Sequence, residues 1–313
     1  MKFVALAFVS PNRKNGAMRF DVHAAARLCG VALILCVCVL ACHSPSSLRM
    51  DAFAKYNLDF DTSVDPQLQS AIESIDTRAR EQFGMGPEHA ALGVLDLRRL
   101  CLAMIHPDRG EYAASVPKIA ILLAYFHLRP DAATNLSEET RHELGLMVKA
   151  SDNEAAAKFS QMLGLREIQR VMDENGFYDP RHGGGIWVGK HYGVSGERYG
   201  DPVGDNSHAA TVRQLLRFYL MLEQGKLLSP QASKTMREVF ESPEIPHDQI
   251  KFVKALTGEK VQIIRKWGSW EDWLHDSAVV KGEGRYYAIV GLTHHPRGDE
   301  YLEQVAGAVH KLM

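Results

Sequence analysis

The sequence predicts an α+β fold: an α/β sandwich lobe, built on an antiparallel five-stranded sheet flanked by helices, beside an all-α lobe. Residues 90–105 contain two short apolar runs, residues 261–293 contain three more, and the segment between them is mostly helical in pattern. Because an isolated hairpin is at best marginally stable, we expect the strands from both ends of the chain to share one sheet. The sheet lobe would comprise residues 65–114 and 255–313, and the helical lobe residues 115–254.

The sheet lobe opens with an amphipathic helix. After Asp65-Pro66, apolar side chains recur at spacings of three and four from Leu68 to Phe83, and Gly84 follows as a stop signal. Residues 90–97 and 100–105 then have the pattern of two strands joined by a tight turn. We expect a hairpin whose second strand leads towards Ser115.

The apolar stretch Glu111–Phe126 predicts a buried helix with two reactive groups in its first turn. Ser115 and Lys118 are three residues apart and therefore share one face, and Pro117 suits a first helical turn. The positive end of a helix and apolar surroundings both favour a neutral lysine amine, which could remove the proton of the serine. For an isolated S-x-x-K in a chain of this length, a capping serine with an unrelated lysine is the favoured interpretation.

The middle of the chain predicts a helical lobe interrupted by one long loop. The loop is the glycine-rich passage Gly176–Asn206, and irregular loops of this length are usually functional or disordered. A helix start is indicated at Ser137. Further helices are indicated over residues 154–163, 166–175 and 211–224.

Strand character returns after Gly258. The pattern predicts strands over residues 261–266, 275–281 and 285–293, separated by short polar turns. A last amphipathic helix presents an apolar face from Leu302 to Leu312. We expect this helix and the first one to flank the sheet.

The first 42 residues predict an export signal. Basic residues precede the apolar run Leu28–Ala41, which is too short for a membrane-spanning helix of roughly 20 residues. The run ends at Cys42 in a sequence that resembles the lipobox of bacterial lipoproteins, so we expect Cys42 to be lipidated and to anchor the chain in the bacterial cell envelope, on the periplasmic side. Met18 is a candidate true start, and residues 43–64 look like a tether. The alternative is an uncleaved anchor or a buried helix.

Charge and cysteine content exclude some classes of protein. The chain has 36 basic and 38 acidic residues, and residues 1–42 hold five basic residues and one acidic residue, which leaves 31 basic and 37 acidic residues in the body. This balance gives no electrostatic footprint for nucleic acid. Beyond Cys42 the chain keeps one cysteine, Cys101, so we expect no internal disulfide framework. No histidine spacing matches a zinc motif, so we expect no metal and no cofactor. We also expect the protein to be a monomer.

Two further motifs follow Ser115 and Lys118 in the order that penicillin-recognising serine enzymes use. They are Ser151-Asp152-Asn153, and Lys266-Trp267-Gly268. With the segment Ser207–Leu215 and the three closing strands, they make residues 65–313 resemble a class A serine β-lactamase and its D,D-peptidase relatives. The resemblance implies a β-lactamase/transpeptidase-like fold.

The resemblance also implies roles for individual residues. Ser115 would attack a carbonyl carbon and Lys118 would help remove its proton. Ser151 would pass a proton to the leaving nitrogen, and Asn153 would position Lys118 or the substrate amide. Lys266 would bring positive charge to a substrate carboxylate. The N–H groups of Ser115 and Ser269, the latter following Gly268, would form an oxyanion hole.

Three departures from the family pattern affect the expected substrate and rate. Trp267 stands where the family has a Ser or Thr whose hydroxyl contacts the substrate carboxylate. Ser115 and Ser151 are 36 residues apart, a shorter interval than in familiar class A enzymes, so we expect a more open site. The loop motif E-x-x-L-N that drives deacylation is absent, and Glu197 is the one glutamate in Gly176–Asn206.

The favoured hypothesis is therefore an exported serine hydrolase of the β-lactamase type that acts on an amide or β-lactam through an acyl-enzyme. A D,D-carboxypeptidase acting on peptidoglycan is the first alternative, and a non-catalytic lipoprotein that binds peptidoglycan is the second. Each implies a small-molecule or peptidoglycan-like partner. We expect slow deacylation, with Glu197 as the candidate second base.

Overall fold

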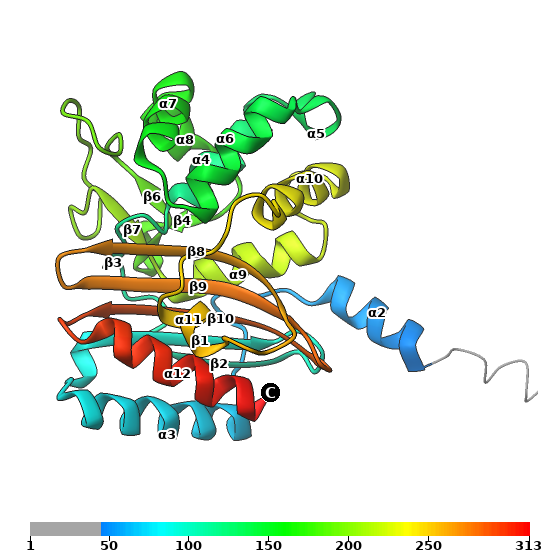
Figure 1. Cartoon of the computed structure of the whole chain (residues 1–313), viewed down its shortest axis with the longest axis vertical. Helices are drawn as coiled ribbons and strands as arrows, with labels where there is room; N and C mark the ends of the chain where they lie inside the picture. Colours follow the sequence, from blue (N-terminus) through cyan, green and yellow to red (C-terminus); the bar gives the residue numbers. More distant parts are fainter. Residues whose placement is uncertain (1–44) are drawn as a thin grey trace, which may run out of the picture. The chain divides into compact units, whose positions relative to one another are not determined.

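The computed structural model of the chain describes residues 45–313 (Figure 1). Cys42 and the predicted signal segment lie outside the described residues, so their assignment stays a prediction. The residues Asp51–Met313 form one compact unit, which is described by itself below. Among residues 45–313, no helix is long and apolar enough to cross a membrane.

One antiparallel sheet combines strands from both ends of the chain, as the sequence predicts. Its order is β2-β1-β10-β9-β8, and every neighbouring pair is antiparallel. The strand bounds are β1 Ala90–Asp96, β2 Cys101–Ile105, β8 Gln262–Trp270, β9 Trp273–Gly282 and β10 Arg285–His294.

Both faces of this sheet are buried. Along β1, Leu92 and Val94 belong to one apolar core, whereas Ala91 and Leu95 belong to a second core. Because successive side chains of a strand point to opposite faces, the two cores lie on the two sides of the sheet. This explains why every residue of β1 is buried.

The first and last helices cover one face of the sheet. They are α3 (Pro66–Phe83) and α12 (Gly298–Leu312), which lie side by side in Figure 1. The bounds of α3 follow from local signals: the Asp65 carboxylate accepts a hydrogen bond from the Leu68 N–H at the start, and Gly84 takes a left-handed conformation at the end.

Most of the helical segment lies on the other face, but its last helix, α11, packs against α12 on the first face (Figure 1). Here α9 (Val212–Glu223) packs directly on β1 and β10, and Thr211 caps its first turn. The remaining helices of the described chain are α2 Pro45–Lys55, α4 Lys118–Leu128, α5 Ala132–Asn135, α6 Glu138–Lys149, α7 Asn153–Leu163, α8 Leu165–Glu174, α10 Pro230–Glu241 and α11 Lys251–Ala255.

The passage Gly176–Asn206 has more regular structure than the sequence predicts. It contains β4 Tyr178–Asp179, β5 Gly184–Gly185 and β6 Trp187–Val188, and a short 3-10 helix. The buried Asp201 carboxylate accepts hydrogen bonds from three backbone N–H groups and from the Tyr178 hydroxyl. These contacts come from pairing across the loop, which residue spacing along the sequence does not reveal.

Part of the segment that resembles a tether packs against the body. Leu58 is 2% exposed and lies in the core. Arg213 donates to the Asp59 carbonyl, and Gln224 donates to the Phe53 and Tyr56 carbonyls. The chain is therefore held to the body from about residue 53, which leaves a shorter candidate tether than residues 43–64.

Candidate active site

Ser115 lies in a turn that precedes the helix, not in its first turn as the sequence pattern predicts. The residues Glu111–Tyr112 form β3, which pairs with β7 (His208–Ala210). Ala114 then takes a left-handed conformation, with φ at 47°, and α4 begins at Lys118. The half-buried Ser115 therefore stands at the junction between a strand and a buried helix.

Lys118 begins this buried helix and is itself fully buried. Its Nζ lies 2.8 Å from Asn153 Oδ1, 3.2 Å from the Asp152 carbonyl and 2.5 Å from the Ser151 carbonyl. A neutral amine donates two hydrogen bonds and keeps one lone pair. These acceptors can take both hydrogens, which leaves the lone pair for a proton from a neighbouring hydroxyl.

Burial lowers the pKa of Lys118 from its usual value to about 7, against a smaller opposing effect of the Asp152 charge. A general base works best when its pKa lies near the operating pH. The hydroxyl of Ser115 makes no hydrogen bond with any residue in 45–313. The proton acceptor is therefore held in place, while the nucleophile is free to turn towards a substrate.

Ser151 connects two lysines. Its Oγ lies 3.4 Å from Lys118 Nζ and accepts a hydrogen bond of 2.9 Å from Lys266 Nζ. Lys266 is fully buried in β8, and burial, followed by the charge of Lys118, holds the pKa of Lys266 well below its usual range. The two lysine amines and the Ser151 hydroxyl, each of which can carry a proton, thus form one connected series of polar groups.

Gly268 allows β8 to pass close to the serine turn. A Cβ atom at this position would lie 2.8 Å from Ser115 N and 2.8 Å from the Ala113 carbonyl, distances that real Cβ contacts do not show. Because β8 is an edge strand, some of its N–H groups face away from β9. The strand thus brings Ser269 beside the N–H of Ser115, the pair predicted to form the oxyanion hole.

Trp267 replaces the usual hydroxyl with an aromatic ring that lies close to two buried lysine amines. Lys266 Nζ lies 5.1 Å and Lys251 Nζ 5.2 Å from the ring centroid. The buried Lys251, from α11, donates to Ser269 Oγ at 2.6 Å and to the Gly268 carbonyl at 2.9 Å. Lys251, which also lies 3.5 Å from Asp299 Oδ1, thus places a second buried amine behind the edge strand, which sequence motifs alone do not indicate.

A cleft of about 220 Å³ opens in front of these groups. Ser115, Asn153 and Ser269 line one part of it, and residues 190–193 and 207–208 line another. The structure thus brings Ser115, Lys118, Ser151, Asn153, Lys266, Gly268 and Ser269 together. Their catalytic roles stay predictions.

Tyr192 was not predicted as part of the site, yet its ring covers Lys118. Lys118 Nζ lies 4.6 Å from the ring centroid, and the buried Tyr192 hydroxyl donates to the Ala114 carbonyl at 3.0 Å. His208 packs against the same ring at 4.2 Å, and burial lowers the pKa of His208 to about 4. His208 is therefore neutral near pH 7, and an aromatic ring fills the space next to the lysine.

Glu197 does not join this group. Its side chain is exposed, makes no hydrogen bond or ion pair with any residue in 45–313, and does not line the cleft. The neighbouring Arg198 pairs with Asp205 at 3.1 Å and not with Glu197. The structure thus gives no contact that would hold Glu197 as a second base.

A buried ion pair positions the strand that carries Lys266, and sequence analysis missed it. Arg265 and Asp276 are fully buried, with Arg265 Nη2 and Asp276 Oδ2 2.7 Å apart. Arg265 also donates to the Asp248 and Ile250 carbonyls. These bonds fix the chain segment that leads into α11 and Lys251. The two opposite charges are visible in the sequence, but recognising them as a pair requires knowing how β8 and β9 are aligned.

Solved structures share this fold at low sequence identity. A β-lactamase from Sphaerobacter thermophilus DSM 20745 matches with a TM-score of 0.63 and 14% identity, over 78% of this chain and 96% of that chain. A class A β-lactamase from Mycobacterium abscessus matches with a TM-score of 0.60 and 15% identity, over 77% and 98%. A variant of PBP-A, solved as an acyl-enzyme complex with penicillin G, matches with a TM-score of 0.57 and 19% identity, over 78% and 96%.

The sequence comparison agrees with the fold. No curated protein sequence matches the chain. The profile of the Beta-lactamase enzyme family matches residues 134–312, more than half of the chain. The matched region includes Ser151, Asn153 and Lys266 and begins after Ser115 and Lys118. Family and fold together support a serine hydrolase of the β-lactamase and penicillin-binding-protein type. The chain belongs to the Beta-lactamase enzyme family.

Proposed function

We propose that the protein is a serine hydrolase that forms an acyl-enzyme with an amide or β-lactam and releases the acyl group slowly. The observation that carries this proposal is the environment of Lys118: a buried amine with a pKa of about 7, three residues from Ser115 and hydrogen-bonded to Ser151 and Asn153. Such an arrangement favours proton removal from a hydroxyl near neutral pH.

Acylation would proceed by proton transfers within this cluster. Ser115 Oγ attacks the carbonyl carbon while its proton moves to Lys118 Nζ. The carbonyl oxygen gains the negative charge, and the N–H groups of Ser115 and Ser269 stabilise it. When the intermediate collapses, the C–N bond breaks and a proton passes through Ser151 Oγ to the leaving nitrogen, a path supported by the 3.4 Å and 2.9 Å contacts of Ser151.

Substrate recognition would rely on positive charge. Lys266 and Lys251 both lie at β8, and a substrate carboxylate would raise the pKa of each buried amine towards its charged form. The ring of Trp267 cannot supply the hydroxyl that the family uses. We therefore infer a carboxylate-bearing substrate attracted by the amine of Lys266 once that amine is protonated, with Lys251 contributing from behind β8 and with a small β-lactam or a peptidoglycan peptide as candidates.

Slow deacylation is the second part of the proposal. Hydrolysis of an acyl-enzyme needs a base that activates water, and the exposed Glu197 has no contact that directs it to Ser115. The ring of Tyr192 occupies the position next to Lys118. These two features favour a long-lived adduct, so the protein would behave more like a penicillin-binding peptidase than like a resistance enzyme.

Labelling with a fluorescent penicillin tests the proposal. We expect the purified protein to gain one covalent label, detected by intact mass, and the label to persist after excess reagent is removed. Ser115→Ala should take up none. Absence of labelling in the folded wild-type protein would instead favour a non-catalytic protein that binds peptidoglycan, and rapid multiple turnover would contradict slow deacylation.

We also propose that the protein is exported and anchored to the cell envelope through a lipid on Cys42, on the sequence pattern described above. Membrane fractionation of the wild type and Cys42→Ser tests this. The wild type should fractionate with membranes, and Cys42→Ser should be released. A Cys42→Ser protein that stays fully membrane-bound would indicate a retained N-terminal anchor instead.

A further inference from the structure

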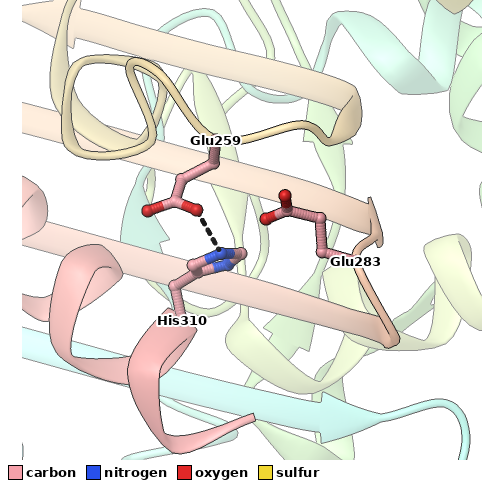
Figure 2. A group of neighbouring side chains, drawn as sticks. All are labelled: Glu259, Glu283 and His310. Atoms are coloured by element: carbon pink, nitrogen blue, oxygen red, sulfur yellow. Dashed lines mark ion pairs between the residues drawn. The ribbon is translucent and has the colours of Figure 1, made fainter.

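Three potential metal ligands meet at the end of the sheet remote from Ser115. Glu259 lies in the loop before β8, Glu283 lies in the turn between β9 and β10, and His310 lies in the last turn of α12 (Figure 2). One ligand atom from each lies within 4.8 Å of the others. Because β8 runs from Gln262 to Trp270, this cluster and the cleft lie at opposite ends of the strand.

The imidazole of His310 is the independent sign that the cluster has a ligand. The residue is 3% exposed, and its Nδ1 lies 3.0 Å from the hydroxyl of the buried Tyr287. Its Nε2 has no hydrogen-bond partner among residues 45–313 and points towards the Glu259 carboxylate, with Nε2 and Oε2 3.6 Å apart (Figure 2). That distance is too long for a hydrogen bond, so a buried nitrogen is left unsatisfied between two carboxylates.

We propose that Glu259, Glu283 and His310 bind one divalent transition-metal ion, with Zn²⁺ as the best match. Zinc takes imidazole nitrogen and carboxylate oxygen together, whereas Mg²⁺ and Ca²⁺ prefer oxygen ligands. If Nδ1 carries the hydrogen and donates it to Tyr287, the lone pair of Nε2 faces the carboxylates. This is the arrangement that outer-shell partners usually impose on a metal-binding histidine.

The distances require little rearrangement. Ligands about 2.0–2.1 Å from a tetrahedral zinc ion lie about 3.3 Å apart, close to the 3.6 Å between His310 and Glu259. Both glutamate side chains are partly exposed and belong to a loop and a turn, so they can close on the ion while the buried His310 stays fixed. Water would complete the coordination.

Nearby charges have two opposing effects on a cation at this cluster: Arg285 disfavours it and the end of α12 favours it. Arg285 donates through Nε to the His310 carbonyl at 2.9 Å, and its Nη1 lies 3.9 Å from Glu283 Oε2, so this half-buried cation would compete with the metal, although an ion pair at that distance is weak. The C-terminal end of α12 presents partial negative charge to the site, which favours a cation. Bound zinc would join three segments far apart in the sequence and stabilise the folded state.

Calorimetric titration of zinc into the chelator-treated, full-length protein in detergent tests the proposal. The test variant is Glu259→Gln combined with Glu283→Gln, because both residues are exposed and their replacement leaves the core unchanged. Glu81→Gln, an exposed glutamate on α3, is the matched control. We expect the wild type and Glu81→Gln to bind one equivalent of zinc with equal affinity, and the double variant to bind at least 100-fold more weakly.

Thermal unfolding supplies a second measurement. Zinc should raise the Tm of the wild type and of Glu81→Gln but not that of the double variant, and Mg²⁺ should raise none of them. The proposal is wrong if the double variant binds zinc as tightly as the wild type, which would assign the binding to other histidines. It is equally wrong if the folded wild type binds no zinc at millimolar concentration.

Discussion

Two regions contribute to the cleft around Ser115, and they differ in how firmly their polar groups are held. The first is the junction of α4, α7 and β8, where Lys118, Ser151 and Lys266 are joined by hydrogen bonds and both lysines are fully buried. The second is the passage Gly176–Asn206, where the candidate base Glu197 is exposed and makes no polar contact within residues 45–313.

This difference matters because the two steps of an acyl-enzyme reaction need different bases. The first step needs a proton acceptor beside the serine, and the second needs one beside the attacking water. The junction provides an acceptor whose position and pKa are both fixed by burial. The passage provides an aromatic ring at the lysine instead of a fixed carboxylate. Under the proposed function, the groups needed for acylation are therefore held more firmly than those needed for release.

Replacing the amine of Lys118 should have the largest effect on acylation. Lys118→Met keeps the packing of the stem but removes the proton acceptor, so we expect the rate of penicillin labelling to fall by about 10³-fold. The control is Lys158→Met, an exposed lysine on α7 that pairs with Glu143. Labelling that survives in Lys118→Met and disappears on replacing His208 would mean that a histidine is the base.

Gly268→Ala tests the placement of β8 against the serine turn. The added Cβ would press on Ser115 N and on the Ala113 carbonyl, so the turn or the strand must shift. Because displacements of about 1 Å typically cost about 10²-fold in rate, we expect a loss of that size with little change in Tm. Gly307→Ala on α12, where a Cβ would meet no atom within 4 Å, is the matched control. An unchanged labelling rate would show that the contact does not constrain the turn.

The pH dependence of labelling should reflect the titration of Lys118. The pKa of Lys118 is lowered to about 7 by burial, so the neutral amine predominates above pH 7 and the ammonium below it. The ammonium cannot accept a proton, and the rate should therefore fall about tenfold per unit as the pH drops below 7 and level off above it. Rates measured between pH 5 and 9 give the profile. The pKa of His208 is lowered to about 4, so a rate that stays constant from pH 9 down to pH 5 would point to the histidine instead.

Local signals in the sequence predicted much of the fold. The bounds of α3 follow from Asp65, Gly84 and the spacing of apolar residues between them. The predicted start of the Ser115 helix was wrong because β3 pairs with β7, some 100 residues later in the chain, and this pairing holds residues 111–112 in a strand. A local pattern contains no information about such a partner.

The same distinction applies to the candidate site. The motifs around Ser115, Ser151 and Lys266 could be recognised because each is a short local sequence. Tyr192 and Lys251 could not, because both reach the site through tertiary packing: Tyr192 from an irregular loop, and Lys251 from α11 behind the edge strand. Tyrosine and lysine also occur in many positions outside active sites, so their presence in the sequence does not indicate a role in the site.

Replacing Glu197 should change the reaction least. The result tests whether the junction and the passage Gly176–Asn206 differ in how firmly they hold their polar groups. If Glu197 activated the deacylating water, Glu197→Gln would remove the base and trap the acyl-enzyme, as a loss of about 10²–10⁴-fold in the release rate. The structure gives the carboxylate no such position: it is exposed, it does not line the cleft, and Arg198 pairs with Asp205. We therefore expect Glu197→Gln to change the release rate by less than about twofold, within the range of an exposed substitution away from the site.

Stopped-flow mixing with intact-mass detection measures the release rate, with Glu154→Gln, an exposed glutamate on α7, as the control. Fast release in the wild type that collapses in Glu197→Gln alone would show that the passage closes on the acyl-enzyme and that the second region is as well organised as the first.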